Sequence, residues 1–121
     1  MRILIADDSK TMRMIVMRHL RQAGYGDGEL VEANNGAEAL DATRKGRFDL
    51  ILSDWNMPEL NGYEFLGAFR ADGGTSPFGF VTSESTSEMK QMAMEAGAQF
   101  FITKPFTADT ISEQLSSVLV P

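Results

Sequence analysis

The sequence lacks cysteine altogether, and it contains one tryptophan, one histidine and four prolines among its 121 residues. The absence of cysteine excludes disulfide bonds, thiolate metal sites and thiol catalysis, and it is compatible with a cytoplasmic protein. Metal binding, if there is any, must therefore depend mainly on oxygen ligands.

Basic residues are also scarce, with 11 lysines and arginines against 17 aspartates and glutamates and a formal net charge of -6. Binding to nucleic acid or to an anionic membrane depends on clustered basic side chains, so we expect neither partner. No apolar run approaches the roughly 20 residues of a membrane span. The apolar residues 3–5 meet acidic residues too soon for a signal peptide, so we expect a cytoplasmic location.

The composition is that of a folded globular protein, with 43% hydrophobic and 23% charged residues. A chain of 121 residues can bury a sizeable core, but it has no room for a second one. We therefore expect residues 1–121 to form a single domain with one functional site.

Five short apolar runs are typical of buried β-strands, and they span residues 2–6, 29–33, 49–53, 78–82 and 100–103. Apolar residues recur at helical spacing in the first intervening segment, at Met12, Ile15, Val16, His19, Leu20 and Ala23. Similar patterns follow the fourth and fifth runs, at Met89, Met92, Ala93 and Ala96 and at Ile111, Leu115 and Val118. Shorter helices are expected near residues 37–44 and 63–70.

Capping residues predict where several of these helices begin and end. Gly24 and Gly97 are placed where a left-handed residue can end a helix. Ser85 and Glu88 have the spacing of a capping box, and Thr107 can cap the last helix. The succession of βα units predicts a doubly wound α/β domain, in which helices cover both faces of a five-stranded parallel sheet.

Polar residues follow most of the predicted strands, at the edge where ligands bind in doubly wound sheets. They are Asp7 and Asp8 after the first strand, Asp54 after the third, Thr82 at the end of the fourth and Lys104 after the fifth. Each has an ordinary alternative explanation as a helix cap, a strand-end hydroxyl or a surface lysine. These explanations must all hold at four strand ends together, which favours a common site.

The chemistry of this set points to phosphoryl transfer. Three carboxylates at one edge repel one another unless a cation intervenes, and oxygen ligands without cysteine or a nearby histidine suit Mg²⁺. Lys104 and the Thr82 hydroxyl can stabilise phosphoryl oxygens at the same place. Asp54 is then placed for in-line attack that forms an acyl phosphate.

The acidic pair, the central aspartate, the threonine and the Lys-Pro pair resemble the receiver domain of two-component response regulators over the whole chain. The resemblance implies a flavodoxin-like fold of five βα units with strand order 2-1-3-4-5. It also implies that Asp54 accepts a phosphoryl group from a phosphohistidine on a sensor histidine kinase. Asp8 and Asp54 would bind Mg²⁺ directly, the backbone carbonyl of Asn56 would add a ligand, and Asp7 would act mainly through water.

The same resemblance assigns roles to residues around the acceptor. Lys104 would pair with the phosphoryl group, Thr82 would move toward it, and the peptide bond before Pro105 would be cis. It further implies a signalling phosphoprotein that catalyses its own phosphorylation and slow dephosphorylation, and not an enzyme that acts on metabolites.

Within the family, the chain looks most like the single-domain chemotaxis regulators that bind the flagellar motor switch. The matching segments are DDSKTMR, SDWNMP, FRADG, VTSE and ITKPFTADT. Trp55 beside the acceptor matches this branch, and by resemblance Asn56 and Glu84 tune the access of water or a phosphatase to the acyl phosphate. We therefore expect a monomeric, stand-alone regulator with no output domain, which signals through a separate target protein.

Three features depart from that branch. Phe101 occupies the position of the switch aromatic, where the branch usually has tyrosine, so the ring can rotate but carries no hydroxyl. The segment between Asp54 and Thr82 is shorter, and Gly79 is expected to weaken the fourth strand and give it an unusual shape. Residues 34–36 read Asn-Asn-Gly where the family usually has an acidic residue.

The sequence is compatible with three alternative functions. The protein could be a receiver or phosphate shuttle in a pathway other than motility. A haloacid-dehalogenase-like phosphatase also uses an aspartate nucleophile, but it needs a second aspartate where this chain has Asn56. A flavodoxin-like flavin carrier needs a hydroxyl-rich phosphate loop, and the acidic pair of Asp7 and Asp8 would repel the phosphate.

Overall fold

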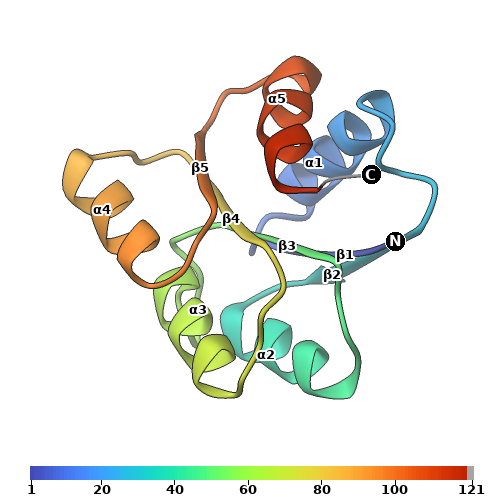
Figure 1. The fold of residues 1–121 in the computed structure, drawn as a ribbon. Coiled ribbons are helices and arrows are strands. Elements are labelled where there is room, and N and C mark those ends of the chain that lie inside the picture. Colours follow the sequence, from blue (N-terminus) through green and yellow to red (C-terminus); the bar gives the residue numbers. More distant parts are fainter. Residues whose placement is uncertain (120–121) are drawn as a thin grey trace.

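Strands and helices alternate along the whole chain in the computed structural model, which describes residues 1–119 (Figure 1). The strands are β1 (Arg2–Ala6), β2 (Glu29–Ala33), β3 (Leu50–Ser53), β4 (Phe78–Thr82) and β5 (Phe100–Thr103). The helices are α1 (Lys10–Gln22), α2 (Gly36–Lys45), α3 (Gly62–Ala71), α4 (Ser87–Glu95) and α5 (Ala108–Val118). These bounds agree with the expected ones to within a residue or two.

The five strands form one parallel sheet in the order β2-β1-β3-β4-β5. Helices α1 and α5 cover one face, and α2, α3 and α4 lie on the other (Figure 1). The predicted doubly wound α/β fold and its strand order are confirmed.

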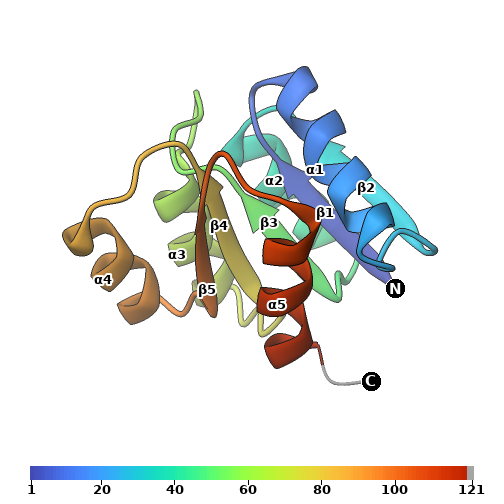
Figure 2. The same cartoon turned by 90° about the horizontal axis from the view of Figure 1, so that it is seen from above.

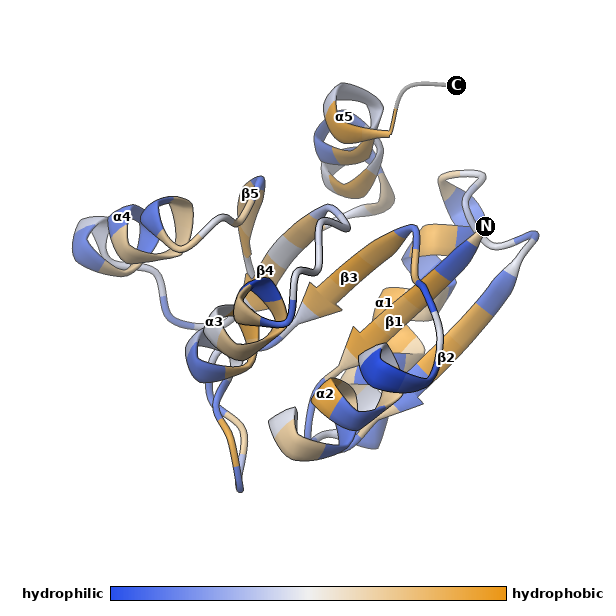
Figure 3. Ribbon diagram, turned by 60° about the horizontal axis from the view of Figure 1, so that its bottom comes forward, coloured by the Kyte–Doolittle hydropathy of each residue, from blue (hydrophilic) through white to orange (hydrophobic). Residues whose placement is uncertain are grey.

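A hydrophobic core lies on each face of the sheet. Strand β1 alternates between the two, because Leu4 packs with α2 and α3 while Ile3 and Ile5 pack with α1 and α5. Every residue of β3 and β4 is buried, and the ribbon in Figure 3 is mostly apolar along the central strands. Continuous apolar runs are what a parallel sheet covered on both faces requires.

The structure confirms most of the predicted helix caps and corrects one. Gly24 and Gly97 follow α1 and α4 with φ of 91° and 104°, and the Thr107 hydroxyl accepts a hydrogen bond from the Thr110 amide at the start of α5. The prediction that Ser85 caps α4 is wrong. Thr86 is the N-cap and accepts from the Met89 amide, so Glu88 lies one position too early to complete a capping box.

Helix α1 turns a different side toward the sheet than its apolar pattern predicts. Its buried residues are Arg13, Val16, Met17 and Leu20, whereas Met12, Ile15, His19 and Ala23 are only partly buried. The predicted stripe therefore lies partly on the flank of the helix. On that flank, His19 packs against Phe106 of the β5–α5 loop, with ring centroids 5.1 Å apart.

Strand β4 is regular, which corrects the expectation of an unusual shape around Gly79. Gly79 pairs with Leu52 of β3 and with Phe100 of β5 without a break in register. The ring of Phe100 occupies the space that a side chain at position 79 would take. The neighbouring aromatic residue thus supplies the packing that glycine cannot.

The shorter connection before β4 is held by Arg70 at the end of α3. The Arg70 guanidinium donates to the carbonyls of Gly74, Ser76 and Gly97 at 3.1, 2.8 and 2.6 Å. It therefore joins the α3–β4 loop to the turn between α4 and β5.

Helices long and apolar enough to cross a bilayer are absent from residues 1–119.

Candidate functional site

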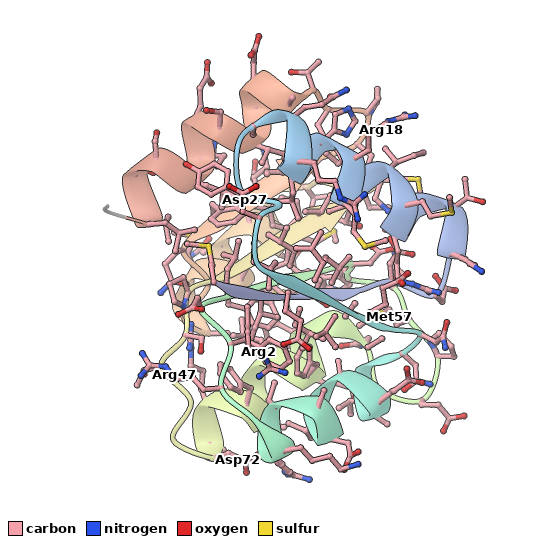
Figure 4. All side chains as sticks on the ribbon, turned by 90° about the vertical axis from the view of Figure 1, so that its right-hand side faces the viewer. Arg2, Arg18, Asp27, Arg47, Met57 and Asp72 are labelled. Carbon is pink, nitrogen blue, oxygen red and sulfur yellow. The ribbon has the colours of Figure 1, made fainter. Side chains whose placement is uncertain are left out.

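The predicted site residues gather at the carboxyl edge of the sheet, where the connections that follow β1, β3, β4 and β5 come together (Figure 2). Figure 4 shows Met57, in the loop after β3, at the opposite end of the molecule from Arg47, which precedes that strand. The parallel direction of the strands accounts for this gathering, since it brings their carboxyl ends to one edge.

Asp54 lies at the centre of this edge, directly after β3. Its amide donates to the carbonyl of Ala6 at 2.9 Å, which extends the pairing of β1 with β3 by one residue. Its Oδ1 accepts from the amide of Trp55 at 2.7 Å. Gly62 lies so close to the Asp54 carbonyl that a side chain there would collide with it. The position of Asp54 is therefore fixed by backbone contacts.

The carboxyl group of Asp54 is poorly solvated, with 12% of its side chain exposed. Burial raises the pKa of this carboxyl above its ordinary value, and the charge of Asp7 raises it further, while Lys104 opposes the shift. The negative charge on Asp54 is consequently unfavourable in the protein without a bound cation.

Asp7 is held at each of its polar atoms. Its amide donates to Ala33 O at 3.1 Å and its carbonyl accepts from Arg13 at 2.6 Å. Its Oδ1 accepts from the Ser9 amide at 2.9 Å, and its Oδ2 accepts from Lys104 Nζ at 3.0 Å. The side chain of Asp8, by contrast, is exposed.

The three aspartates offer a suitable oxygen set for a small divalent cation. One carboxylate oxygen of each of Asp7, Asp8 and Asp54 lies within 4.8 Å of the other two. An octahedral Mg²⁺ with ligands at about 2.1 Å has neighbouring ligand oxygens about 3 Å apart. Small side-chain movements would bring the carboxylates into that range, so these residues fit the metal that the resemblance implies.

Lys104 provides the positive charge of the site. Its Nζ lies 3.0 Å from Asp7 Oδ2 and 3.5 Å from Asp54 Oδ2, and its side chain is 13% exposed. Its amide donates to the carbonyl of Thr82 at 2.8 Å. The peptide bond between Lys104 and Pro105 is cis, as the resemblance implies.

The hydroxyl group of Thr82 is available to form a hydrogen bond with a ligand. The residue is fully buried, and among the described residues its Oγ1 has no hydrogen-bond partner. The hydroxyl is close enough to Asp54 to lower the pKa of that carboxyl slightly, although the two form no hydrogen bond of ordinary geometry. A buried hydroxyl without a partner costs free energy, which an arriving phosphoryl oxygen would recover.

An aromatic cluster joins the loop after β3 to Phe101, the predicted switch position. The ring of Trp55 stacks on Tyr63 with centroids 5.3 Å apart, and it packs on Phe80 at 4.9 Å. Phe101 is partly buried and packs on both Trp55 and Phe80, at 6.3 and 5.9 Å. Asn56 and Glu84 are exposed at the rim of the site.

Sequence reasoning gave no role to Arg13, although this side chain contacts the acidic pair directly. A signal was present, because Arg13 shares the helical spacing of Val16, Met17 and Leu20 and thus belongs to an otherwise apolar column. A charged residue within such a column needs a specific partner.

A surface hollow of about 470 Å³ lies at the other edge of the sheet and contains none of these residues. It is lined by the α2–β3 and α3–β4 loops, near Arg47 and Asp72 in Figure 4. Two of its basic residues, Arg44 and Lys45, are paired with Asp72 and Asp41. The chemistry of the strand ends is therefore separate from this hollow.

Comparison with known sequences agrees with the geometry. Residues 3–116 match the family described as the response regulator receiver domain. The chain is 41% identical over 120 residues to the chemotaxis protein CheY-3 of Vibrio cholerae serotype O1, covering 98% of this chain and 91% of the relative. It is 38% identical to the chemotaxis protein CheY of Pseudomonas aeruginosa, covering 98% and 95%.

Solved structures give the same result. The crystallized chemotaxis protein CheY4 of Vibrio cholerae superposes with a TM-score of 0.86 at 38% identity, covering 98% of both chains. The receiver domain of the putative response regulator NarL from Mycobacterium tuberculosis gives a TM-score of 0.86 at 25% identity, covering 97% and 94%.

Proposed function

The chain belongs to the response regulator receiver family, and on this basis we propose that it is a phosphorylation switch with Asp54 as the acceptor. The proposal rests on one observation, which is that three groups meet at the carboxyl edge of the sheet. They are the carboxylate of Asp54, the ammonium of Lys104 3.5 Å away and the unpartnered hydroxyl of Thr82. Together they provide a nucleophile, a counter-charge and a hydrogen-bond donor.

In the proposed reaction, an oxygen of Asp54 attacks the phosphorus of a phosphohistidine on a sensor histidine kinase. The new O–P bond forms as the P–N bond breaks, and the electron pair of that bond returns to the histidine ring. The result is an acyl phosphate on Asp54. The fixed position of Asp54 at the end of β3 reduces the reorganisation that an in-line attack requires.

Asp8, Asp54 and the backbone carbonyl of Asn56 would hold the Mg²⁺ ion directly, and Asp7 would contribute mainly through water. When bound, Mg²⁺ would neutralise negative charge on the phosphoryl oxygens. The carboxylate set within 4.8 Å and the unfavourable burial of Asp54 support this assignment.

The response would start from two side chains that form new contacts with the phosphoryl group. Lys104 would move from Asp7 to the phosphoryl group, and the Thr82 hydroxyl would donate to a phosphoryl oxygen. Because the Lys104 amide is bonded to the Thr82 carbonyl, the loops after β4 and β5 would shift together. This shift would bias a two-state surface around Phe101, whose ring packs on the aromatic cluster beside Asp54.

We further propose that the protein works as a monomer in the cytoplasm and delivers its signal to a separate target protein. The related proteins with 41% and 38% identity are named as chemotaxis proteins, which favours a role in chemotaxis and a target such as the flagellar motor switch.

Asn56 and Glu84 are exposed at the rim of the site, where they would control access of water or a phosphatase to the acyl phosphate. Slow dephosphorylation would then end the signal.

The test is the intact mass of the wild-type protein and of Asp54→Ala after incubation with acetyl phosphate, with and without Mg²⁺. We expect one labile phosphoryl adduct that requires Mg²⁺ and forms only on the wild type. An equal adduct on the variant would assign the acceptor to another residue. Absence of any adduct with both acetyl phosphate and a phosphorylated sensor kinase would contradict the proposed reaction.

A further inference from the structure

Arg13 carries a full positive charge in the interior of the protein. It lies on the sheet-facing side of α1 and is 6% exposed, which makes it one of the few buried charged residues among those described. A buried guanidinium is tolerated only where its N–H groups have good acceptors. The acceptors that Arg13 uses therefore indicate its role.

Both acceptors lie at the carboxyl ends of neighbouring strands. Arg13 Nη1 donates to the backbone carbonyl of Asp7 at 2.6 Å, and Nε donates to Glu32 Oε1 on β2 at 2.9 Å. The planar fork of the guanidinium connects the two strand ends with fixed geometry. Arg13 therefore connects β2 to the first residue of the acidic pair.

The contact with Asp7 also determines the orientation of Asp8. The Asp7 carbonyl belongs to the planar peptide unit that joins the two aspartates, so a fixed carbonyl fixes the plane from which the Asp8 side chain extends. The exposed side chain of Asp8 has little packing around it. Its direction toward Asp54 then depends strongly on the orientation of this peptide.

We propose that Arg13 is a positioning residue, which holds the Asp7–Asp8 peptide so that the Asp8 carboxylate faces Asp54 and the pair can bind a divalent cation together. This inference rests on the proposed function, because it concerns the same acidic site. Arg13 contacts the backbone of the site and not the reacting atoms, so its effect on Mg²⁺ is indirect.

Arg13 could affect Mg²⁺ binding through its charge or through the position of the peptide, and the two explanations predict opposite changes in Mg²⁺ affinity. If Arg13 acted only through its charge, its removal would relieve repulsion of the cation, and Arg13→Gln would bind Mg²⁺ more tightly. If Arg13 positions the peptide, Arg13→Gln binds Mg²⁺ about 10-fold more weakly or worse, as is common when a partner of a metal ligand is removed. Arg13→Lys keeps the charge but loses the planar fork, and we expect it to weaken binding as well.

The experiment is a Mg²⁺ titration followed by Trp55 fluorescence, together with thermal unfolding of each variant in the absence of metal. Glu32→Gln is the matched control, because it removes the carboxylate but leaves the Arg13 contact with Asp7 in place. We expect its Mg²⁺ affinity to stay within about threefold of the wild type, since the Asp7–Asp8 peptide remains held.

Each outcome bears on one proposal or the other. A wild type that does not respond to Mg²⁺ by fluorescence or by thermal stabilisation contradicts the proposed metal site, and with it the role of Arg13. A wild type that binds Mg²⁺ while Arg13→Gln and Arg13→Lys bind it equally well or better overturns the positioning role alone. If Arg13→Gln does not fold, Arg13→Lys decides, and a loss of thermal stability with unchanged affinity indicates a purely structural residue.

Discussion

Lys104 lies closer to Asp7 than to Asp54, with Nζ to Oδ2 distances of 3.0 and 3.5 Å. The lysine is therefore held mainly by the aspartate that we do not assign as the acceptor. This arrangement keeps the ammonium within reach of the acceptor, where it can respond to a new negative charge. It also means that the lysine must give up a good ion pair when it moves.

Replacement of Lys104 tests this exchange of partners. We expect Lys104→Ala to accept a phosphoryl group on Asp54 but to lose more than about half of the Trp55 fluorescence change that follows phosphorylation, because no ammonium pulls the β5 loop toward the site. The measurement is fluorescence after addition of acetyl phosphate, with the adduct quantified by mass. Lys90→Ala on exposed α4 is the control. A normal response in Lys104→Ala would show that the lysine does not transmit the signal.

The buried charge of Asp54 predicts that Asp54→Asn is more stable than the wild type in buffer without Mg²⁺. The pKa of Asp54 is raised above its ordinary 3.8, so the folded state binds this proton more tightly than the unfolded chain does. The ionised carboxyl therefore destabilises the fold at neutral pH, and this cost disappears as the pH falls through the raised pKa and toward 3.8.

Thermal unfolding of the wild type and of Asp54→Asn from about pH 4 to about neutral pH measures this effect, because the ionised carboxyl of the wild type is lost toward the acid end. We expect the melting temperature of the variant to exceed that of the wild type at neutral pH and the difference to shrink in acid. Asp27→Asn, in the exposed α1–β2 loop, is the control and should give no such difference. A constant difference at all pH values would contradict the electrostatic cause.

A substitution of Asp8 should change the affinity for Mg²⁺ separately from the thermal stability of the metal-free protein. Its side chain is exposed, in contrast to Asp7, which is bonded at both carboxylate oxygens. We expect Asp8→Asn to weaken Mg²⁺ binding by about 10-fold or more while it leaves the melting temperature without metal nearly unchanged. A Mg²⁺ titration with Trp55 fluorescence makes this measurement, and Asp109→Asn on α5 serves as the control. Retained affinity in Asp8→Asn would remove this residue from the metal site.

Arg70 should be important for stability because it donates to three backbone carbonyls in two loops. We expect Arg70→Ala to lower the free energy of unfolding by about 1.5–3 kcal/mol, since the carbonyls lose a charged donor. Urea unfolding gives this value. Arg44→Ala, which removes a solvated ion pair with Asp72, should leave stability nearly unchanged. Equal losses in the two variants would mean that the loop contacts of Arg70 contribute little.

Much of the fold and the proximity of the site residues could be predicted from the sequence. Parallel strands bring their carboxyl ends together, so the positions of Asp7, Asp54 and Lys104 in the sequence were enough to predict that they meet. Their distances confirm that proximity. The glycines after α1 and α4 were equally clear, because a positive φ strongly favours that residue.

Other features depended on contacts that a linear pattern does not contain. Ser85 and Thr86 are adjacent hydroxyl residues, and only the path of the chain decides which of them caps α4. The buried face of α1 includes Arg13 because acceptors are present on β1 and β2, and a hydropathy pattern cannot show them. The regularity of β4 at Gly79 likewise depends on a residue of another strand.

Gly79 and Phe100 share a single volume at the first residue pair between β4 and β5. Neither position can therefore evolve freely, because a larger residue at 79 would require a smaller one at 100. Among related proteins, the two positions should covary, and some relatives should carry the glycine on β5 and the bulky side chain on β4. In a laboratory exchange of domains or segments between relatives, these two strands should be transferred together.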